Sequence, residues 1–151
     1  MAKRAVFGLA GWSGSGKTTL AEKLIKVLSE RGLTVATIKH AHHKFDADMP
    51  GKDSWRHRKA GAGQVLVSSA MRSAHFIEHD REEPSLEMLL ARLNPCDIVL
   101  VEGFKKEAIP KLEIYRGELE LSPLYPEDPY IIALVSDTPP EDCQLPILAS
   151  A

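Results

Sequence analysis

Apolar residues along the chain switch between strand-like runs and helical spacing. Residues 5–10 read Ala-Val-Phe-Gly-Leu-Ala, a short apolar run that is typical of a buried strand. Leucine and valine then recur at helical spacing from Leu20 to Leu28, and Gly32 follows as a helix end. Residues 34–39 form a second short apolar run. The N-terminal part of the chain therefore predicts a strand, a helix and a second strand.

The rest of the pattern continues this alternation. We expect a helix over residues 53–60, with Asp53 as its N-cap, and a helix over residues 85–93. Residues 111–121 indicate a hairpin that turns at Arg116 and is added beyond the core. Strands that alternate with helices favour an α/β fold, with a mostly parallel sheet between two helix layers. The other expected strands cover residues 64–69, 74–79, 97–101 and 130–135.

A phosphate-binding sequence joins the first strand to the first helix. Residues 11–18, Gly-Trp-Ser-Gly-Ser-Gly-Lys-Thr, fit the pattern G-x-x-x-x-G-K-[ST] at every position. Glycines let backbone N–H groups close around phosphate oxygens, and the following helix points its positive end at the same anion. The sequence therefore predicts a three-layer P-loop NTPase sandwich. Its expected phosphate contacts are Gly11, Ser13, Gly14, Ser15, Gly16, Lys17, Thr18 and Thr19.

Two side chains are candidates for the Mg²⁺ ion that accompanies a bound nucleotide. The Thr18 hydroxyl is one ligand of the P-loop pattern. Glu102 directly follows an apolar strand, at the carboxyl end where a second metal-side carboxylate belongs, and Gly103 beside it can offer an N–H group to the γ phosphate. Asp97 stands at the other end of that strand, roughly 16 Å away at the usual rise per residue. We expect Asp97 to cap a turn or face solvent.

The most polar stretch of the chain follows the second strand. Residues 39–48 contain three histidines and two aspartates, but no recognised zinc spacing. A transition-metal site and a solvated loop are both open interpretations. The position after the second strand favours a third, a substrate or switch loop in which Asp46 or Asp48 orients water or accepts a proton near the γ phosphate. The basic residues Lys52 and Arg56 beyond it either clamp an anion or form an exposed helix face.

A further carboxylate, Asp137, follows the expected strand 130–135. It can accept hydrogen bonds from the amide and amino groups of guanine. The guanine-reading motif N-K-x-D is missing, since the local sequence is Ala-Leu-Val-Ser-Asp. A preference for GTP through Asp137 is therefore a hypothesis, and a helix or turn cap is the alternative role.

Size and composition narrow the function classes. A chain of 151 residues suits a single domain, and its net charge of −2 gives no basic field for nucleic acid. Cys96 and Cys143 lie far apart and outside any C-x-x-C motif, which indicates reduced thiols. No apolar run reaches the length of a membrane span. We expect a cytoplasmic protein that acts on neither membranes nor nucleic acid.

Five short motifs occur in order along the chain before Asp137. They are residues 11–19, 38–43, 48–54, 58–62 and 101–105. Together they resemble the molybdopterin-guanine dinucleotide biosynthesis protein B family. The resemblance implies an adaptor that binds GTP and hydrolyses it weakly. It also implies a homodimer with an extended sheet, and as partner the guanylyltransferase that attaches GMP to molybdopterin.

The resemblance also implies roles for particular residues. The motif at Glu102 belongs to the metal side, and the segment from His40 to Lys52 lines the pocket beside the nucleotide. The main alternative function is an ATP-dependent small-molecule kinase, in which Asp46 or Asp48 is the base. A third candidate function is that of a module that binds a partner or delivers a metal and uses its nucleotide site as a switch. Carried over by motif, phosphate and Mg²⁺ are held by Gly14, Gly16, Lys17, Thr18 and Thr19.

Overall fold

A computed structural model of the protein describes residues 3–41, 45–80 and 82–150. The chain divides into two compact units. The first joins Met1–His40 to Leu86–Ala151, and the second is Ala41–Ser85. The single-domain organisation expected from chain length stays a prediction.

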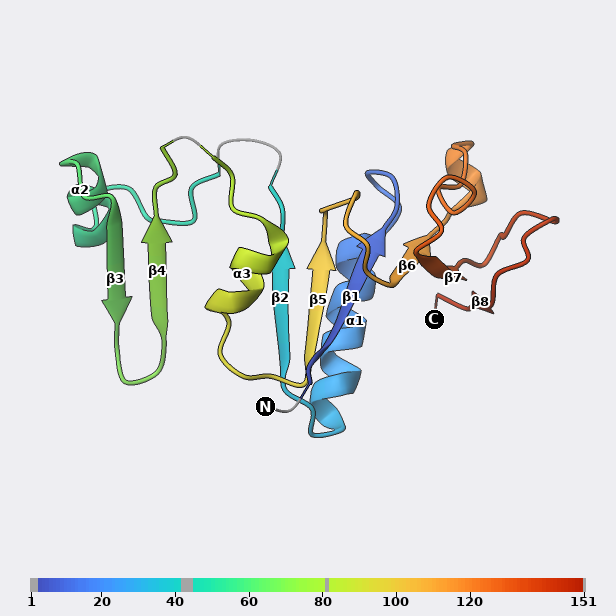
Figure 1. The fold of residues 1–151 in the computed structure, drawn as a ribbon, viewed down its shortest axis with the longest axis horizontal. Coiled ribbons are helices and arrows are strands. Elements are labelled where there is room, and N and C mark those ends of the chain that lie inside the picture. The colour runs from blue at the N-terminus through green and yellow to red at the C-terminus, as the bar shows by residue number, and fades with distance from the viewer. Residues whose placement is uncertain (1–2, 42–44, 81, 151) are drawn as a thin grey trace. The chain divides into compact units, whose positions relative to one another are not determined.

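The first unit is built on a six-stranded sheet (Figure 1). Its order is β2-β5-β1-β6-β7-β8, and every neighbouring pair is parallel. Because parallel strands all end at the same edge of a sheet, the segments that follow β1, β5, β6 and β7 share one rim. The strands are β1 (Ala5–Ala10), β2 (Val35–Lys39), β5 (Ile98–Glu102), β6 (Lys111–Ile114), β7 (Ile131–Val135) and β8 (Ile147–Leu148).

One helix packs on each face of this sheet. Successive side chains of a strand point to opposite faces, so Val6 and Leu9 of β1 join different apolar clusters. Helix α1 (Lys17–Glu30) covers one cluster and α3 (Leu86–Arg92) covers the other. This confirms the three-layer arrangement. The α1 cluster contains Leu9, Ile114 and Val135 with Leu20 and Leu24, and the α3 cluster contains Ile38, Val99 and Val101 with Leu86 and Leu90.

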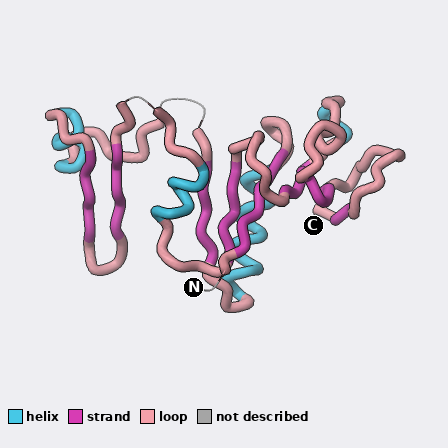
Figure 2. The backbone as a smooth tube through the Cα atoms, viewed as in Figure 1, coloured by secondary structure: helices cyan, strands magenta, loops and turns pink. Residues whose placement is uncertain are grey.

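The second unit holds a two-stranded antiparallel sheet and one helix (Figure 2). Strand β3 (Gln64–Ser68) pairs with β4 (Ser73–Ile77), and α2 (Asp53–Lys59) precedes them. Both strands were expected from the sequence, but they pair with each other and not with the parallel sheet. The N-cap of α2 is Lys52, whose backbone is extended, and Asp53 is the first helical residue. The expected cap at Asp53 was therefore wrong by one position.

The hairpin expected over residues 111–121 is wrong. Strand β6 lies inside the sheet, parallel to both β1 and β7, and it is followed by a 3-10 helix over Gly117–Leu119. The antiparallel hairpin of this chain is β3–β4. Because β6 has a paired strand on each side, its backbone groups are not free to pair with a second chain.

Strand β6 misled the prediction because its polar residues are buried. Lys111 is 3% exposed and Glu113 is 0% exposed. Lys111 Nζ donates to Asp128 Oδ2 at 2.7 Å and to the Lys105 carbonyl at 3.0 Å. The Glu113 carboxylate accepts the N–H groups of Leu124 and Tyr125 at 2.6 and 2.8 Å. Partners of this kind allow polar side chains to stand at core positions.

Two smaller expectations are confirmed. Asp97 caps a turn, since its Oδ2 accepts hydrogen bonds from the backbone N–H and the hydroxyl of Thr34 at 2.7 and 2.8 Å. These bonds hold the pKa of the Asp97 carboxyl below its usual value. Cys96 and Cys143 are both free thiols. Among the described helices, none is long and apolar enough to cross a membrane.

We predict that Glu113→Ala destabilises the fold. The substitution leaves two interior N–H groups without an acceptor, and each such group costs about 1–3 kcal/mol. Urea unfolding should show a loss of about 2–4 kcal/mol in the free energy of unfolding. The control Glu107→Ala alters an exposed carboxylate and should leave the midpoint unchanged.

A pH series gives a second arm of this test. Burial raises the pKa of the Glu113 carboxyl above its ordinary value of 4.5, although the two backbone donors lower it. The folded protein therefore holds this proton more tightly than the unfolded chain. The contribution of Glu113 to stability is greatest below pH 4.5 and falls as the pH rises through the raised pKa. A stability difference between wild type and Glu113→Gln that stays constant with pH would contradict this assignment.

Candidate functional site

The loop between β1 and α1 is shaped to hold phosphate. Gly14 and Gly16 have φ of 81° and 101°, backbone angles that side-chain-bearing residues rarely adopt. Gly16 is the N-cap of α1, and that helix has no side-chain cap and no acidic residue in its first turn. Within the part of the chain that the structure describes, no side chain caps the first N–H groups of α1. These groups can therefore bind an anion.

Two side chains of the loop are poised for a ligand. The Ser15 hydroxyl is buried and, among the described residues, has no hydrogen-bond partner. Lys17 Nζ donates to the carbonyls of Gly11 and Trp12 at 2.6 and 3.3 Å, so the ammonium lies against its own loop. Burial lowers the pKa of Lys17, while the nearby Glu102 raises it. These observations fit a loop that closes around phosphate oxygens.

The two residues expected to hold Mg²⁺ are neighbours in the first unit. Thr18 and Glu102 line one small cavity of about 160 Å³. Glu102 ends β5 and lies opposite Leu9 of β1 in the strand register. Lys39 Nζ lies 3.9 Å from Glu102 Oε1, a distance at which a cation partly neutralises the carboxylate. A hydroxyl and a carboxylate are the hard oxygen ligands that Mg²⁺ prefers, so these two residues fit the ion.

Gly103 and His40 lie beside Glu102. Gly103 has φ of 93°, and a Cβ atom there would lie 2.5 Å from the Cβ of His40. A side chain at residue 103 would therefore clash as well as strain the backbone. The His40 ring packs against Phe104, with the ring centroids 5.1 Å apart, and its backbone N–H donates to the Glu102 carbonyl. His42 and His43, the other members of the expected histidine cluster, lie outside the described residues.

Asp46 and Asp48 make their contacts within the second unit. Arg58 Nη1 lies 3.0 Å from Asp46 Oδ1 and 3.1 Å from Asp48 Oδ2, and its Nε lies 2.8 Å from Glu78 Oε1. The Asp48 backbone N–H and the Arg58 side chain hold the pKa of Asp46 below its usual value. A carboxylate with a lowered pKa and a cation partner is a weak base. The exposed Lys52 lies in the same unit.

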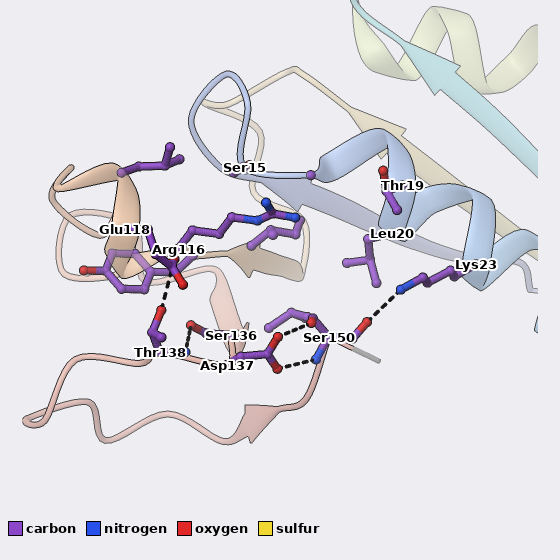
Figure 3. A pocket seen from close by; sticks show the side chains of 15 residues that line it. Ser15, Thr19, Leu20, Lys23, Arg116, Glu118, Ser136, Asp137, Thr138 and Ser150 are labelled. Atoms are coloured by element: carbon purple, nitrogen blue, oxygen red, sulfur yellow. Dashed lines mark hydrogen bonds between the residues drawn. The ribbon is translucent and has the colours of Figure 1, made fainter.

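A larger cavity of about 470 Å³ lies on the other side of the phosphate loop. Ser15, Gly16 and Thr19 line it together with Asp137, which follows β7 (Figure 3). The Gly117 backbone N–H donates to the Thr138 hydroxyl at 2.9 Å and so joins the segments after β6 and β7. The phosphate loop and the predicted base-reading carboxylate thus border one cavity of the size of small-molecule sites.

Sequence reasoning missed two residues of this cavity. Arg116 extends from the end of β6 toward the phosphate loop, and a Cβ atom on Gly16 would lie 3.0 Å from its Nη2 (Figure 3). Ser150 bonds to Asp137 through its N–H group and its hydroxyl. These bonds lower the pKa of Asp137. Had residues 111–114 been assigned to a parallel strand, Arg116 would have stood out at the carboxyl end.

Comparison with known proteins shows the family to which the sequence is similar. The sequence model of the family described as "Molybdopterin guanine dinucleotide synthesis protein B" matches residues 6–137. The chain is 45% identical over 138 residues to the "Molybdopterin-guanine dinucleotide biosynthesis adapter protein" of Escherichia coli, covering 89% of this chain and 79% of that protein. The protein of that name from Haemophilus influenzae is 44% identical over 138 residues, covering 90% and 76%.

Solved structures agree with the fold. The crystal structure of Bacillus subtilis MobB superposes with a TM-score of 0.72 at 28% identity, covering 97% of this chain and 90% of that chain. A crystal structure named for molybdopterin-guanine biosynthesis protein B gives 0.71 at 27% identity, covering 96% and 90%.

We predict that Lys17→Ala strongly reduces the stabilisation of the protein by a nucleoside triphosphate. An ammonium bonded to phosphate contributes about 1.5–3 kcal/mol, so affinity should fall about 10- to 100-fold. Thermal unfolding with and without nucleotide measures this. The control Lys26→Ala removes an exposed lysine from the same helix and should behave as wild type. Unchanged nucleotide stabilisation in Lys17→Ala would refute the phosphate-loop assignment.

We predict that Glu102→Gln weakens the response to Mg²⁺ more than nucleotide binding itself. The neutral amide is a poorer partner for the ion, and the gain in nucleotide affinity on adding Mg²⁺ should shrink about 10- to 100-fold. Mg²⁺ titrations at fixed nucleotide, with the exposed Glu107→Gln as control, measure this. If the Glu102→Gln titration matches wild type, Glu102 has no metal-side role.

Proposed function

Because the chain belongs to the molybdopterin guanine dinucleotide synthesis protein B family, we propose that it is a GTP-binding adapter in molybdopterin guanine dinucleotide synthesis. One observation carries the nucleotide part of this proposal. Ser15 and Gly16 of the phosphate loop line the same cavity as Asp137. A triphosphate held by the loop can therefore extend its base toward a carboxylate.

Guanine suits that carboxylate better than adenine does. Guanine presents two adjacent donors, its ring N–H and its amino group, and a carboxylate has two oxygens that accept them. Adenine has no such donor pair on the corresponding edge. Arg116 and Lys23 also border the cavity, and their charges suit a ligand that carries phosphates and a carbonyl oxygen.

The site is better suited to holding GTP than to hydrolysing it quickly. Thr18 and Glu102 would hold Mg²⁺ against the phosphates, and the ion would supply charge neutralisation there. The described residues that line the two cavities include no glutamine to orient an attacking water. Slow intrinsic hydrolysis is the expected consequence.

The adapter part of the proposal comes from the relatives. Two proteins at 45% and 44% identity are named as adapters in molybdopterin-guanine dinucleotide biosynthesis. We propose that this chain likewise binds the enzyme that attaches GMP to molybdopterin. We also propose that the protein is a homodimer and that it acts in the cytoplasm. The free thiols of Cys96 and Cys143 fit a reducing compartment of this kind.

The geometry of the second unit argues against an ATP-dependent kinase. A kinase of this kind needs a base near the γ phosphate, and Asp46 and Asp48 were the candidates. Both are ion-paired with Arg58, and Asp48 also accepts a hydrogen bond from Ser54 at 2.8 Å. Carboxylates engaged in this way stabilise the local fold and are poorly placed to take a proton from a substrate.

We predict that calorimetric titration shows GTP binding with a preference over ATP of at least about tenfold, the discrimination expected from a charge-assisted pair of hydrogen bonds. The titration is run with and without Mg²⁺, which should tighten GTP binding. The purified guanylyltransferase is then titrated into the GTP-loaded chain and should bind it.

Two results would contradict the proposal. Equal or stronger binding of ATP would remove the base preference and favour the kinase. Failure of the GTP-loaded chain to bind the guanylyltransferase, or to increase formation of the dinucleotide cofactor when added to it, would remove the adapter role. The Lys17→Ala variant, whose nucleotide affinity is expected to be lower, serves as the weak-binding control in both assays.

A further inference from the structure

Ser150 occupies the Asp137 carboxylate in the way a guanine base would. The Ser150 backbone N–H donates to Asp137 Oδ1 at 3.2 Å, and the Ser150 hydroxyl donates to Asp137 Oδ2. One residue thus places two neighbouring donors on the two oxygens of one carboxylate. This is the donor pair that guanine offers and adenine lacks.

The backbone carbonyl of Ser150 makes the resemblance to guanine closer. Its carbonyl oxygen accepts a hydrogen bond from Lys23 Nζ at 3.1 Å (Figure 3). Ser150 therefore presents one acceptor and two donors to Lys23 and Asp137. The Watson–Crick edge of guanine carries the same set, a carbonyl oxygen, a ring N–H and an amino group.

These contacts lie inside the cavity that adjoins the phosphate loop. Ser150, Lys23 and Asp137 line it with Ser15 and Gly16. A base attached to phosphates on the loop and Ser150 therefore compete for the same carboxylate. Arg116, whose guanidinium lies against Gly16, borders the same space and is available to the ligand.

The segment that carries Ser150 is attached weakly enough to be displaced. Strand β8 consists of only Ile147–Leu148 at one side of β7. Both residues are more than two-fifths exposed, at 44% and 47%. A two-residue strand with exposed side chains adds little apolar burial, so its release costs mainly the two hydrogen bonds that the N–H groups of Leu134 and Ser136 donate to the carbonyls of Pro146 and Leu148.

We propose that Ser150 is an internal ligand of the base-reading carboxylate Asp137, which GTP displaces and ATP does not. The inference rests on the proposed GTP site and adds a competitor to it. Occupation by Ser150 keeps Asp137 paired when no nucleotide is bound. It lowers the apparent affinity for GTP by the fraction of molecules whose carboxylate is occupied.

Ser150→Ala tests the competition. The variant loses the hydroxyl donor, so apparent GTP affinity should rise roughly two- to tenfold, the range of one net hydrogen bond. ATP affinity should stay constant, and the melting temperature without nucleotide should fall slightly. The combination of a weaker resting contact and tighter GTP binding is specific to competition. The control Ser29→Ala removes an exposed hydroxyl from α1 and should change neither affinity.

Asp137→Asn completes a double-mutant cycle. Alone, it should bring GTP affinity down toward that for ATP. Combined with Ser150→Ala, it should erase the gain that Ser150→Ala gives by itself. Calorimetric titration of the four proteins with GTP and with ATP, all with Mg²⁺, measures the affinities that the cycle compares.

The outcomes separate the inference from the proposed function. If wild type prefers GTP but Ser150→Ala leaves GTP affinity unchanged, or raises GTP and ATP affinity by the same factor, the internal-ligand proposal is overturned and the GTP site stands. A gain from Ser150→Ala that persists with Asp137→Asn overturns it as well. If wild type shows no preference for GTP, both proposals are overturned.

Discussion

The parallel pairing of β5, β1, β6 and β7 brings four loops to one rim of a single sheet. The phosphate loop follows β1, Glu102 ends β5, Arg116 follows β6 and Asp137 follows β7. No antiparallel arrangement of these strands would place all four at the same edge. The composition of the site is therefore a consequence of strand direction, because the end of each strand places one of these functional groups at the rim.

Polar contacts between neighbouring segments hold this rim in place. Glu113 of β6 accepts the N–H groups of Leu124 and Tyr125, which fixes the segment between β6 and β7. Trp12 of the phosphate loop donates its indole N–H to the Ser122 carbonyl of the same segment at 2.7 Å. The phosphate loop is thus connected to the interior carboxylate of a neighbouring strand.

The sequence predicted the parts of this structure that local patterns encode. The phosphate loop, the strand before it, the helix after it and the position of Glu102 follow from motif and periodicity alone. Strand β6 was placed in a hairpin outside the sheet because its alternation of polar and apolar residues is that of a half-exposed strand. Lys111 and Glu113 are nevertheless buried, since Asp128 and the 124–125 backbone satisfy them from a distant segment.

The same limit explains the other differences. The pairing of Ser150 with Asp137 joins residues far apart in the chain, and no local pattern signals it. Asp46 and Asp48 were assigned a chemical role because their position after β2 was visible, whereas their partner Arg58 was not. Whether a polar residue serves chemistry or structure depends on its partners in space, and spacing along the sequence does not reveal them.

A crystal structure with a non-hydrolysable GTP analogue and Mg²⁺ tests the central claim most directly, because it locates phosphate, metal and base together. In that structure, phosphates should lie on the N–H groups of residues 14–18, Mg²⁺ between Thr18 and Glu102, and guanine on Asp137 with Ser150 displaced. A base bound elsewhere, with Ser150 still on Asp137, would contradict it.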